Sequence, residues 1–110
     1  ADFWKMHVGM AAKEAMKSAP TPLTGALRID IEFRMPRPKR LRKADVDIPH
    51  TCRPDTDNLV KSTLDALQMA SVVADDSVFF DLRAVKYYSN PEESSYAKIG
   101  IITVRNPLED

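Results

Sequence analysis

One run of ten residues, ALRIDIEFRM at 26–35, constrains the fold of this chain more than any other stretch. Apolar and charged side chains alternate along it without a fault, and a period of two is typical of a β-strand with one buried and one solvated face. Pro36 and Pro38 then end the strand. The side chains expected to face the core are Leu27, Ile29, Ile31, Phe33 and Met35, and those expected to face water are Arg28, Asp30, Glu32 and Arg34.

Four further elements are predicted around this strand. A helix is expected over 3–18, where Trp4, Val8, Ala11 and Ala15 recur at helical spacing. A second helix is expected from Asp55 or Asp57 to about Ala70, with a broad apolar side and a polar side. Two strands follow, SVFFDLRAVKYYS and YAKIGIITVR, joined by NPEES. In the first of these, Val78, Phe80, Leu82 and Ala84 are expected on one face.

The order helix, strand, helix, strand, strand predicts one α/β (α+β) domain over 1–110. A chain of 110 residues is long enough to bury a single core. The expected architecture is a two-layer sandwich in which two helices cover a small mixed sheet. Core burial is expected for Trp4, Phe79 and Phe80, with a dimer surface as the alternative for each. Because an opening helix is unusual in such a sandwich, we also expect a preceding N-terminal strand that this sequence does not contain.

Charge is unevenly distributed, although the chain carries 16 basic and 16 acidic residues. Six of the basic residues lie in RMPRPKRLRK with no acid among them, namely Arg34, Arg37, Lys39, Arg40, Arg42 and Lys43. A neutral total argues against a protein that coats nucleic acid generally. A flexible basic arm or loop over 37–52 is nevertheless suited to phosphate contacts. The expected DNA-binding residues are Lys39, Arg40, Arg42, Lys43 and Arg53.

Other features argue for a chain in the cytoplasm without a membrane partner. No apolar run approaches the roughly 18 residues that suggest a spanning helix, and no signal peptide is visible. Cys52 is the only cysteine, so no disulfide can form within the chain. His50 and Cys52 form an HTC triplet, but two ligands without a second pair favour a plain loop over a zinc site.

The acidic residues around the second helix have two interpretations. Asp55 and Asp57 lie at its start, where one carboxylate can cap free amides and the other can interact with the helix dipole. Lys61 follows Asp57 after one turn and Asp65 follows Lys61 after another, which is also the spacing of ordinary surface ion pairs. The adjacent Asp75 and Asp76 repel each other, and a turn requires only one of them, so a cation or basic partner would relieve them.

The second interpretation of these acids is a metal site. Mg²⁺ prefers oxygen ligands and keeps several waters, and in such sites it activates water and neutralises charge on a phosphoryl group. A nearby lysine can stabilise the same charge. Together with the basic arm, the acids favour a metal-dependent nuclease.

Two segments resemble the RusA-type endodeoxyribonucleases, the Holliday junction resolvases of bacteria and their phages or prophages. They are RPDTDNLVKSTLDAL at 53–67 and ADDSVFFDLRAVK at 74–86. The shared pattern is D-x-D-N-L-x-K at a helix start, D-A-L within that helix, and D-D before a strand that ends in a lysine. The matching residues are Asp55, Asp57, Asn58, Leu59, Lys61, Asp65, Ala66, Leu67, Asp75, Asp76 and Lys86.

The resemblance implies a homodimeric hydrolase of DNA recombination and repair. Such an enzyme binds four-way junction DNA and cuts two opposed strands symmetrically, with no small-molecule cofactor. On this chain it implies that Asp55, Asp57 and Asp76 hold Mg²⁺ or Mn²⁺. It further implies that Lys61 assists catalysis, with Asp75 and Asn58 in support.

Two other functions stay open. A catalytically inactive DNA-binding or scaffold protein can retain the same fold, although the intact acid set argues against it. A metal-dependent phosphohydrolase acting on nucleotides is the third possibility, but the sequence shows no base-binding element.

Overall fold

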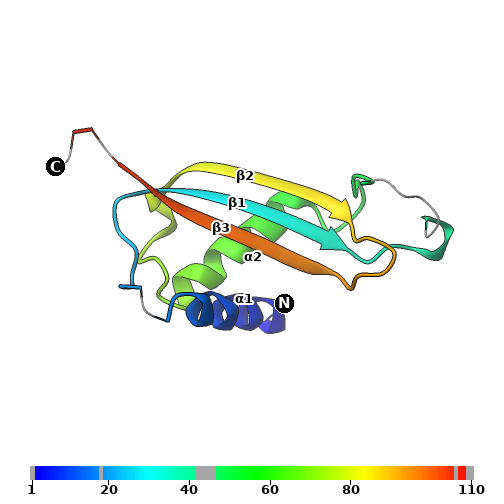
Figure 1. Cartoon of the computed structure of the whole chain (residues 1–110), viewed down its shortest axis with the longest axis horizontal. Coiled ribbons are helices and arrows are strands. Elements are labelled where there is room, and N and C mark those ends of the chain that lie inside the picture. Colours follow the sequence, from blue (N-terminus) through cyan, green and yellow to red (C-terminus); the bar gives the residue numbers. More distant parts are fainter. Residues whose placement is uncertain (1, 18, 42–46, 106, 109–110) are drawn as a thin grey trace.

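The computed structural model describes residues 2–17, 19–41, 47–105 and 107–108, with only the backbone of 2–4. The elements in chain order are α1 (Asp2–Ala15), β1 (Ala26–Met35), the 3-10 turn η1 (Lys39–Leu41), α2 (Thr56–Met69), the 3-10 turn η2 (Asp76–Val78), β2 (Phe79–Tyr88) and β3 (Tyr96–Val104). The two helices lie against one side of the sheet, which gives two layers (Figure 1). The predicted α+β class and element order are confirmed.

The sheet is mixed, as predicted, with the strand order β2-β1-β3. β1 pairs in parallel with β2 and antiparallel with β3. Its central position explains the strict alternation of its sequence, because one face contacts the helices and the other is open. Leu27, Ile29, Ile31 and Phe33 are buried on the helix side, as expected.

The core joins these β1 side chains to both helices and to the turn after α2. Val8 of α1, Ala66 and Leu67 of α2, and Val72 and Val73 complete the buried apolar cluster. The two helices approach each other closely at Gly9. A Cβ on this residue would lie only 3.1 Å from the Cβ of Ala70, so a side chain at this position would force the helices apart.

The expected burial of Phe80 is wrong. Its side chain is 60% exposed, and that of Leu82, expected on the same face, is 42% exposed. The register explains Phe80: Leu27 pairs with Phe79 but Arg28 pairs with Asp81, so Phe80 is an additional residue at an irregularity in β2. The side chain of Trp4 lies outside the described residues.

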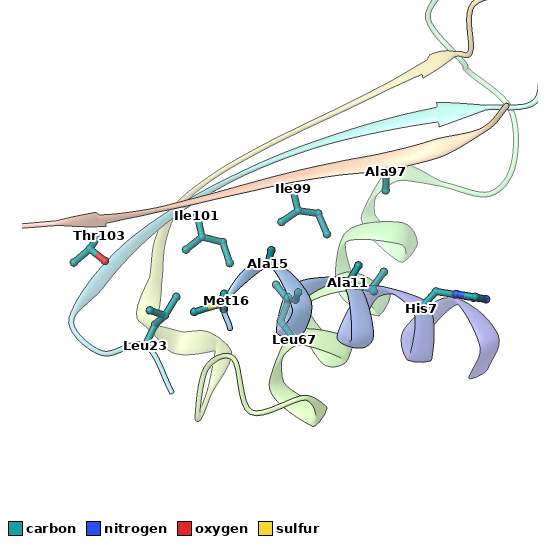
Figure 2. A pocket seen from close by; sticks show the side chains of 12 residues that line it. His7, Ala11, Ala15, Met16, Leu23, Leu67, Ala97, Ile99, Ile101 and Thr103 are labelled. Atoms are coloured by element: carbon teal, nitrogen blue, oxygen red, sulfur yellow. The ribbon is translucent and has the colours of Figure 1, made fainter. Parts of the chain in front are cut away.

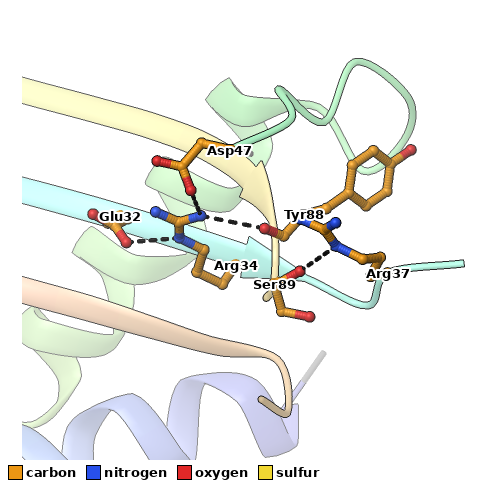
Figure 3. A network of polar contacts seen from close by, with 6 residues as sticks. All are labelled: Glu32, Arg34, Arg37, Asp47, Tyr88 and Ser89. Carbon is orange, nitrogen blue, oxygen red and sulfur yellow. Dashed lines mark hydrogen bonds and ion pairs between the residues drawn. The ribbon is translucent and has the colours of Figure 1, made fainter. Parts of the chain in front are cut away.

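Arg34, expected on the solvated face, is only 9% exposed. Its guanidinium donates hydrogen bonds to Asp47 at 2.9 Å, to Glu32 at 2.7 Å and to the carbonyl oxygen of Tyr88 at 3.3 Å (Figure 3). The bonds to Asp47 and Glu32 raise the pKa of Arg34. A buried charge is tolerated only when it is paired in this way, and the main partner comes from the basic arm.

The described parts of the basic arm are hydrogen-bonded to residues at and next to the end of β2. Arg37 donates from Nε to the carbonyl of Ser89 at 2.6 Å (Figure 3) and from Nη1 to that of Leu41 at 3.0 Å. At the other end of the arm, the amide of Tyr88 donates to the carbonyl of Ile48 at 2.9 Å. The arm therefore leaves and rejoins the sheet at fixed points, and residues 42–46 between them lie outside the described residues.

An apolar groove with a volume of about 520 Å³ separates α1 from β3. Ala11 and Ala15 of α1 face Ile99 and Ile101 of β3 across it (Figure 2).

None of the helices in the described part of the chain is long and apolar enough to span a bilayer.

Candidate functional site at the start of α2

Asp55 is the N-cap residue of α2, but its side chain does not cap the helix. Its backbone is extended (φ −69°, ψ 146°), and the carboxylate makes no hydrogen bond to the amides of the first turn. The carbonyl of Asp55 does accept the first helical bond, from the amide of Leu59 at 3.1 Å. The structural interpretation of Asp55 as a side-chain cap is therefore not supported, and the exposed carboxylate is left for another ligand.

Asp57 lies in the first turn of α2 and is exposed. The positive end of the helix dipole favours a negative charge at this position. Lys61 and Asn58 are also exposed on this polar side, whereas Thr63, Ala66 and Leu67 are buried on the opposite side. The sequence therefore predicted the two sides of the helix correctly.

The alternative in which Lys61 belongs to a surface ion pair with Asp65 is not what the structure shows. Asp65 instead pairs with Lys5 of α1, at 3.5 Å between Nζ and Oδ2. Such a half-exposed pair contributes at most about 1 kcal/mol to stability. In the described part of the chain, no ion pair holds the ammonium group of Lys61, which lies one turn beyond Asp57.

The adjacent acids at the start of η2 have different environments. Asp75 accepts a hydrogen bond from the amide of Ser77 at 3.0 Å and so caps this turn. Hydrogen bonding to the side chain of Ser77, and secondly to its amide, lowers the pKa of Asp75. In the described part of the chain, Asp76 makes hydrogen bonds only through its backbone: its amide donates to the Oε1 of Gln68 at 3.1 Å, and its carbonyl accepts from the amide of Phe79. Turn chemistry thus occupies one acid, as the sequence suggested, and leaves the exposed carboxylate of Asp76.

The structure does not bring Asp76 to Asp55 and Asp57. The hydrogen bond to Gln68 fixes Asp76 near the last turn of α2, whereas Asp55 and Asp57 lie at its first turn. A helix of 14 residues is about 21 Å long. Figure 1 shows η2 and the start of α2 at different ends of the helix. Over the residues that the structure describes, no three His, Cys, Asp or Glu side chains are grouped to hold a metal.

Two carboxylates nevertheless suit a hard cation at the start of α2. Mg²⁺ is commonly held by one or two carboxylates together with water. Asp55 and Asp57 provide oxygen ligands of this kind, on the surface and next to a helix N-terminus. The predicted set of three ligands is therefore available only in part from a single chain.

Lys86 contacts the loop immediately before Asp55. From the end of β2, its Nζ donates hydrogen bonds to the carbonyl of Cys52 at 2.7 Å and to that of Pro54. The sequence named Lys86 as part of a motif but gave it no role. Its place on the strand gives the reason for the contact: Lys86 follows Leu82 and Ala84 at every second residue, on the face of β2 that pairs with the buried face of β1.

The HTC triplet forms a packed loop. His50 is 8% exposed, and its Nε2 lies 3.4 Å from the Sγ of Cys52. Its ring packs edge-on against Tyr88, with the centroids 4.8 Å apart. Burial lowers the pKa of His50, and the charge of Lys86 lowers it further, so the imidazole is neutral near pH 7.

Three of the predicted DNA-binding residues are described, and all three are exposed. Arg53 is exposed two residues before Asp55, and Lys39 and Arg40 are exposed in η1. Figure 1 places η1 at the end of the molecule where α2 begins. Arg42 and Lys43 lie outside the described residues.

Comparison with known proteins gave two matches. A family model described as Endodeoxyribonuclease RusA matches residues 1–94, which include every candidate site residue named above. The chain is also 32% identical over 95 residues to the uncharacterized protein YqaN of Bacillus subtilis (strain 168). That alignment covers 79% of this chain and 65% of YqaN, so the chain spans slightly less than two thirds of this relative.

Proposed function

This chain belongs to the endodeoxyribonuclease RusA family, and from this premise we propose that it is a metal-dependent endodeoxyribonuclease that resolves Holliday junctions. The family match agrees with the resemblance carried by 53–67 and 74–86. The observation that carries the proposal is the first turn of α2, where Asp55 and Asp57 are exposed and Asp55 does not cap the helix.

The proposed reaction is hydrolysis of a phosphodiester bond. Asp55 and Asp57 would hold Mg²⁺ or Mn²⁺, and the ion would supply an activated water and a counter-charge for the phosphate. Lys61, exposed one turn beyond Asp57, would place its ammonium group near the negative charge that develops on the phosphate or the leaving oxygen. Asn58, on the same exposed side, would orient substrate or water by hydrogen bonds.

A second copy of the chain would complete the site. Asp76 cannot reach Asp55 and Asp57 in its own chain, because most of the length of α2 separates them. In a symmetric dimer, Asp76 of each copy can approach the α2 N-terminus of the other, which gives two equivalent sites. A dimer with two sites also suits the paired cuts that junction resolution requires.

The basic arm would bind the DNA backbone. Replacing Arg40, Arg42 and Lys43 by Ala should weaken junction binding and reduce the slope of log K against log salt by up to about 3 for each bound chain, since each phosphate contact contributes about 0.9. Fluorescence anisotropy of a labelled junction between about 50 and 200 mM salt measures this slope. Ala at the exposed Lys13 of α1 and at Lys17 just after this helix removes two charges per chain elsewhere and should leave the slope unchanged. An unchanged slope in the arm variant would exclude a phosphate-binding role.

A panel of substrates tests the activity itself. With Mg²⁺ we expect cleavage of a four-way junction but not of a linear duplex or a free nucleotide, and EDTA should stop it, because the proposed carboxylate ligands act through a bound cation. Junction binding without cleavage in either Mg²⁺ or Mn²⁺ would indicate an inactive DNA-binding protein. Hydrolysis of free nucleotides alone would indicate a phosphohydrolase.

A further inference from the structure

We propose that Lys86 is a positioning residue that holds the loop carrying Asp55 in the shape needed to bind the metal. This inference rests on the proposed function. Its direct basis is the pair of hydrogen bonds from Nζ of Lys86 to the carbonyls of Cys52 and Pro54. These carbonyls lie three residues and one residue before Asp55.

The bond to Pro54 acts on Asp55 through the peptide plane. The carbonyl of Pro54 and the amide of Asp55 belong to one rigid planar unit, so fixing the carbonyl also fixes the direction in which the chain enters Asp55. The bond to Cys52 holds the loop at a second point, 2.7 Å from the ammonium nitrogen. Hydrogen bonds from a charged donor are roughly twice as strong as neutral ones, which suits a clamp on an exposed loop.

The support for this clamp is rigid. Lys86 lies within β2, in register with the buried Phe33 of the central strand. Its own carbonyl accepts a hydrogen bond from the amide of His50 at 2.9 Å. The loop is therefore attached to β2 through both the backbone and the side chain of one residue.

A direct contact between Lys86 and a DNA phosphate is the competing role. Two of the three ammonium N–H donors are already used on backbone carbonyls, so a phosphate would find one donor at most. The geometry thus favours positioning over substrate binding.

The test replaces Lys86 by Met, which keeps a long apolar stem but removes the donors, in the full chain. Removing a hydrogen bond that orients a metal ligand, from a residue that does not itself bind the metal, typically lowers metal affinity by about 10- to 100-fold. We expect Mn²⁺ alone to bind K86M about tenfold or more weakly by calorimetry, and added Mn²⁺ to restore part of the cleavage. Junction affinity in EDTA and its salt slope should not change. K86R, which keeps charged donors, should recover most of the affinity, and K98M on β3 is the matched control.

Hydrogen exchange separates this inference from the proposed function. Without metal, the amides of 55–59 should exchange faster in K86M than in the wild type and K98M. If the wild type does not cleave junctions but K86M still loosens these amides, the nuclease proposal fails and the clamp stands. The positioning role would be contradicted if K86M bound Mn²⁺ as tightly as the wild type and its 55–59 amides exchanged at the wild-type rate. It would also be contradicted if K86M bound the junction more weakly and with a lower salt slope, because that result indicates a phosphate contact. If K86M does not fold, the same measurements of Mn²⁺ affinity and amide exchange are made on K86Q and K86R.

Discussion

Replacing Asp57 by Asn is expected to reduce junction cleavage by about a thousandfold while junction binding survives. Asn keeps the size of the side chain but removes the negative charge that a divalent cation requires, and losing one preorganised electrostatic group in an active site typically costs about 10²- to 10³-fold or more in rate. Asp57 is exposed at a helix start, so stability should fall by at most about 1 kcal/mol. Gel assays of a labelled four-way junction measure cleavage, and anisotropy in Ca²⁺ or EDTA measures binding.

Asp65→Asn is the matched control for this variant. Asp65 also lies on α2, but its carboxylate pairs with Lys5 of α1, away from the first turn. Its loss should leave cleavage close to the wild-type rate. Normal cleavage by Asp57→Asn, with Asp65→Asn equally active, would remove the start of α2 from the catalytic site.

The central strand could be predicted from sequence because its two faces meet different environments along its whole length. The pattern of β2 was less informative, since the extra residue Phe80 shifts the alternation and a period of two cannot reveal such an irregularity. The burial of Arg34 depends on Asp47, thirteen residues further along the chain. A partner supplied by a folded-back loop leaves no periodic signal in the strand itself.

The local grouping of Asp55, Asp57 and Lys61 could also be predicted from sequence, because the three residues lie within two helical turns. The position of Asp76 relative to them could not. Asp76 was expected to join the other two carboxylates, yet α2 carries the chain about 21 Å in between. Helix length alone could have warned of this separation. The contact from Lys86 required the tertiary structure, since it joins residues 32 and 34 positions apart.

The separation of Asp76 leads to the second large effect, which concerns mixed dimers. Asp57→Asn and Asp76→Asn should each be inactive alone, because each removes a ligand from both sites of its dimer. When the two chains are co-expressed, about half of the dimers should contain one of each. If Asp76 acts on the other copy, such a dimer has one site with both defects and one intact site.

The purified mixed dimer should therefore nick junctions at about half of the wild-type rate, because one of its two sites is intact, and the unfractionated mixture should do so at about a quarter. They should not make paired cuts, because the opposed strand meets the defective site. Different tags on the two chains allow the mixed dimer to be purified, and a nicked-junction gel distinguishes one cut from two. If each site were built within one chain, every site of the mixed dimer would keep one defect and no activity would return. Recovered nicking thus requires a dimer in which each copy contributes its Asp76 to the site of the other. If purified, folded mixed dimers do not nick junctions, the shared site is ruled out.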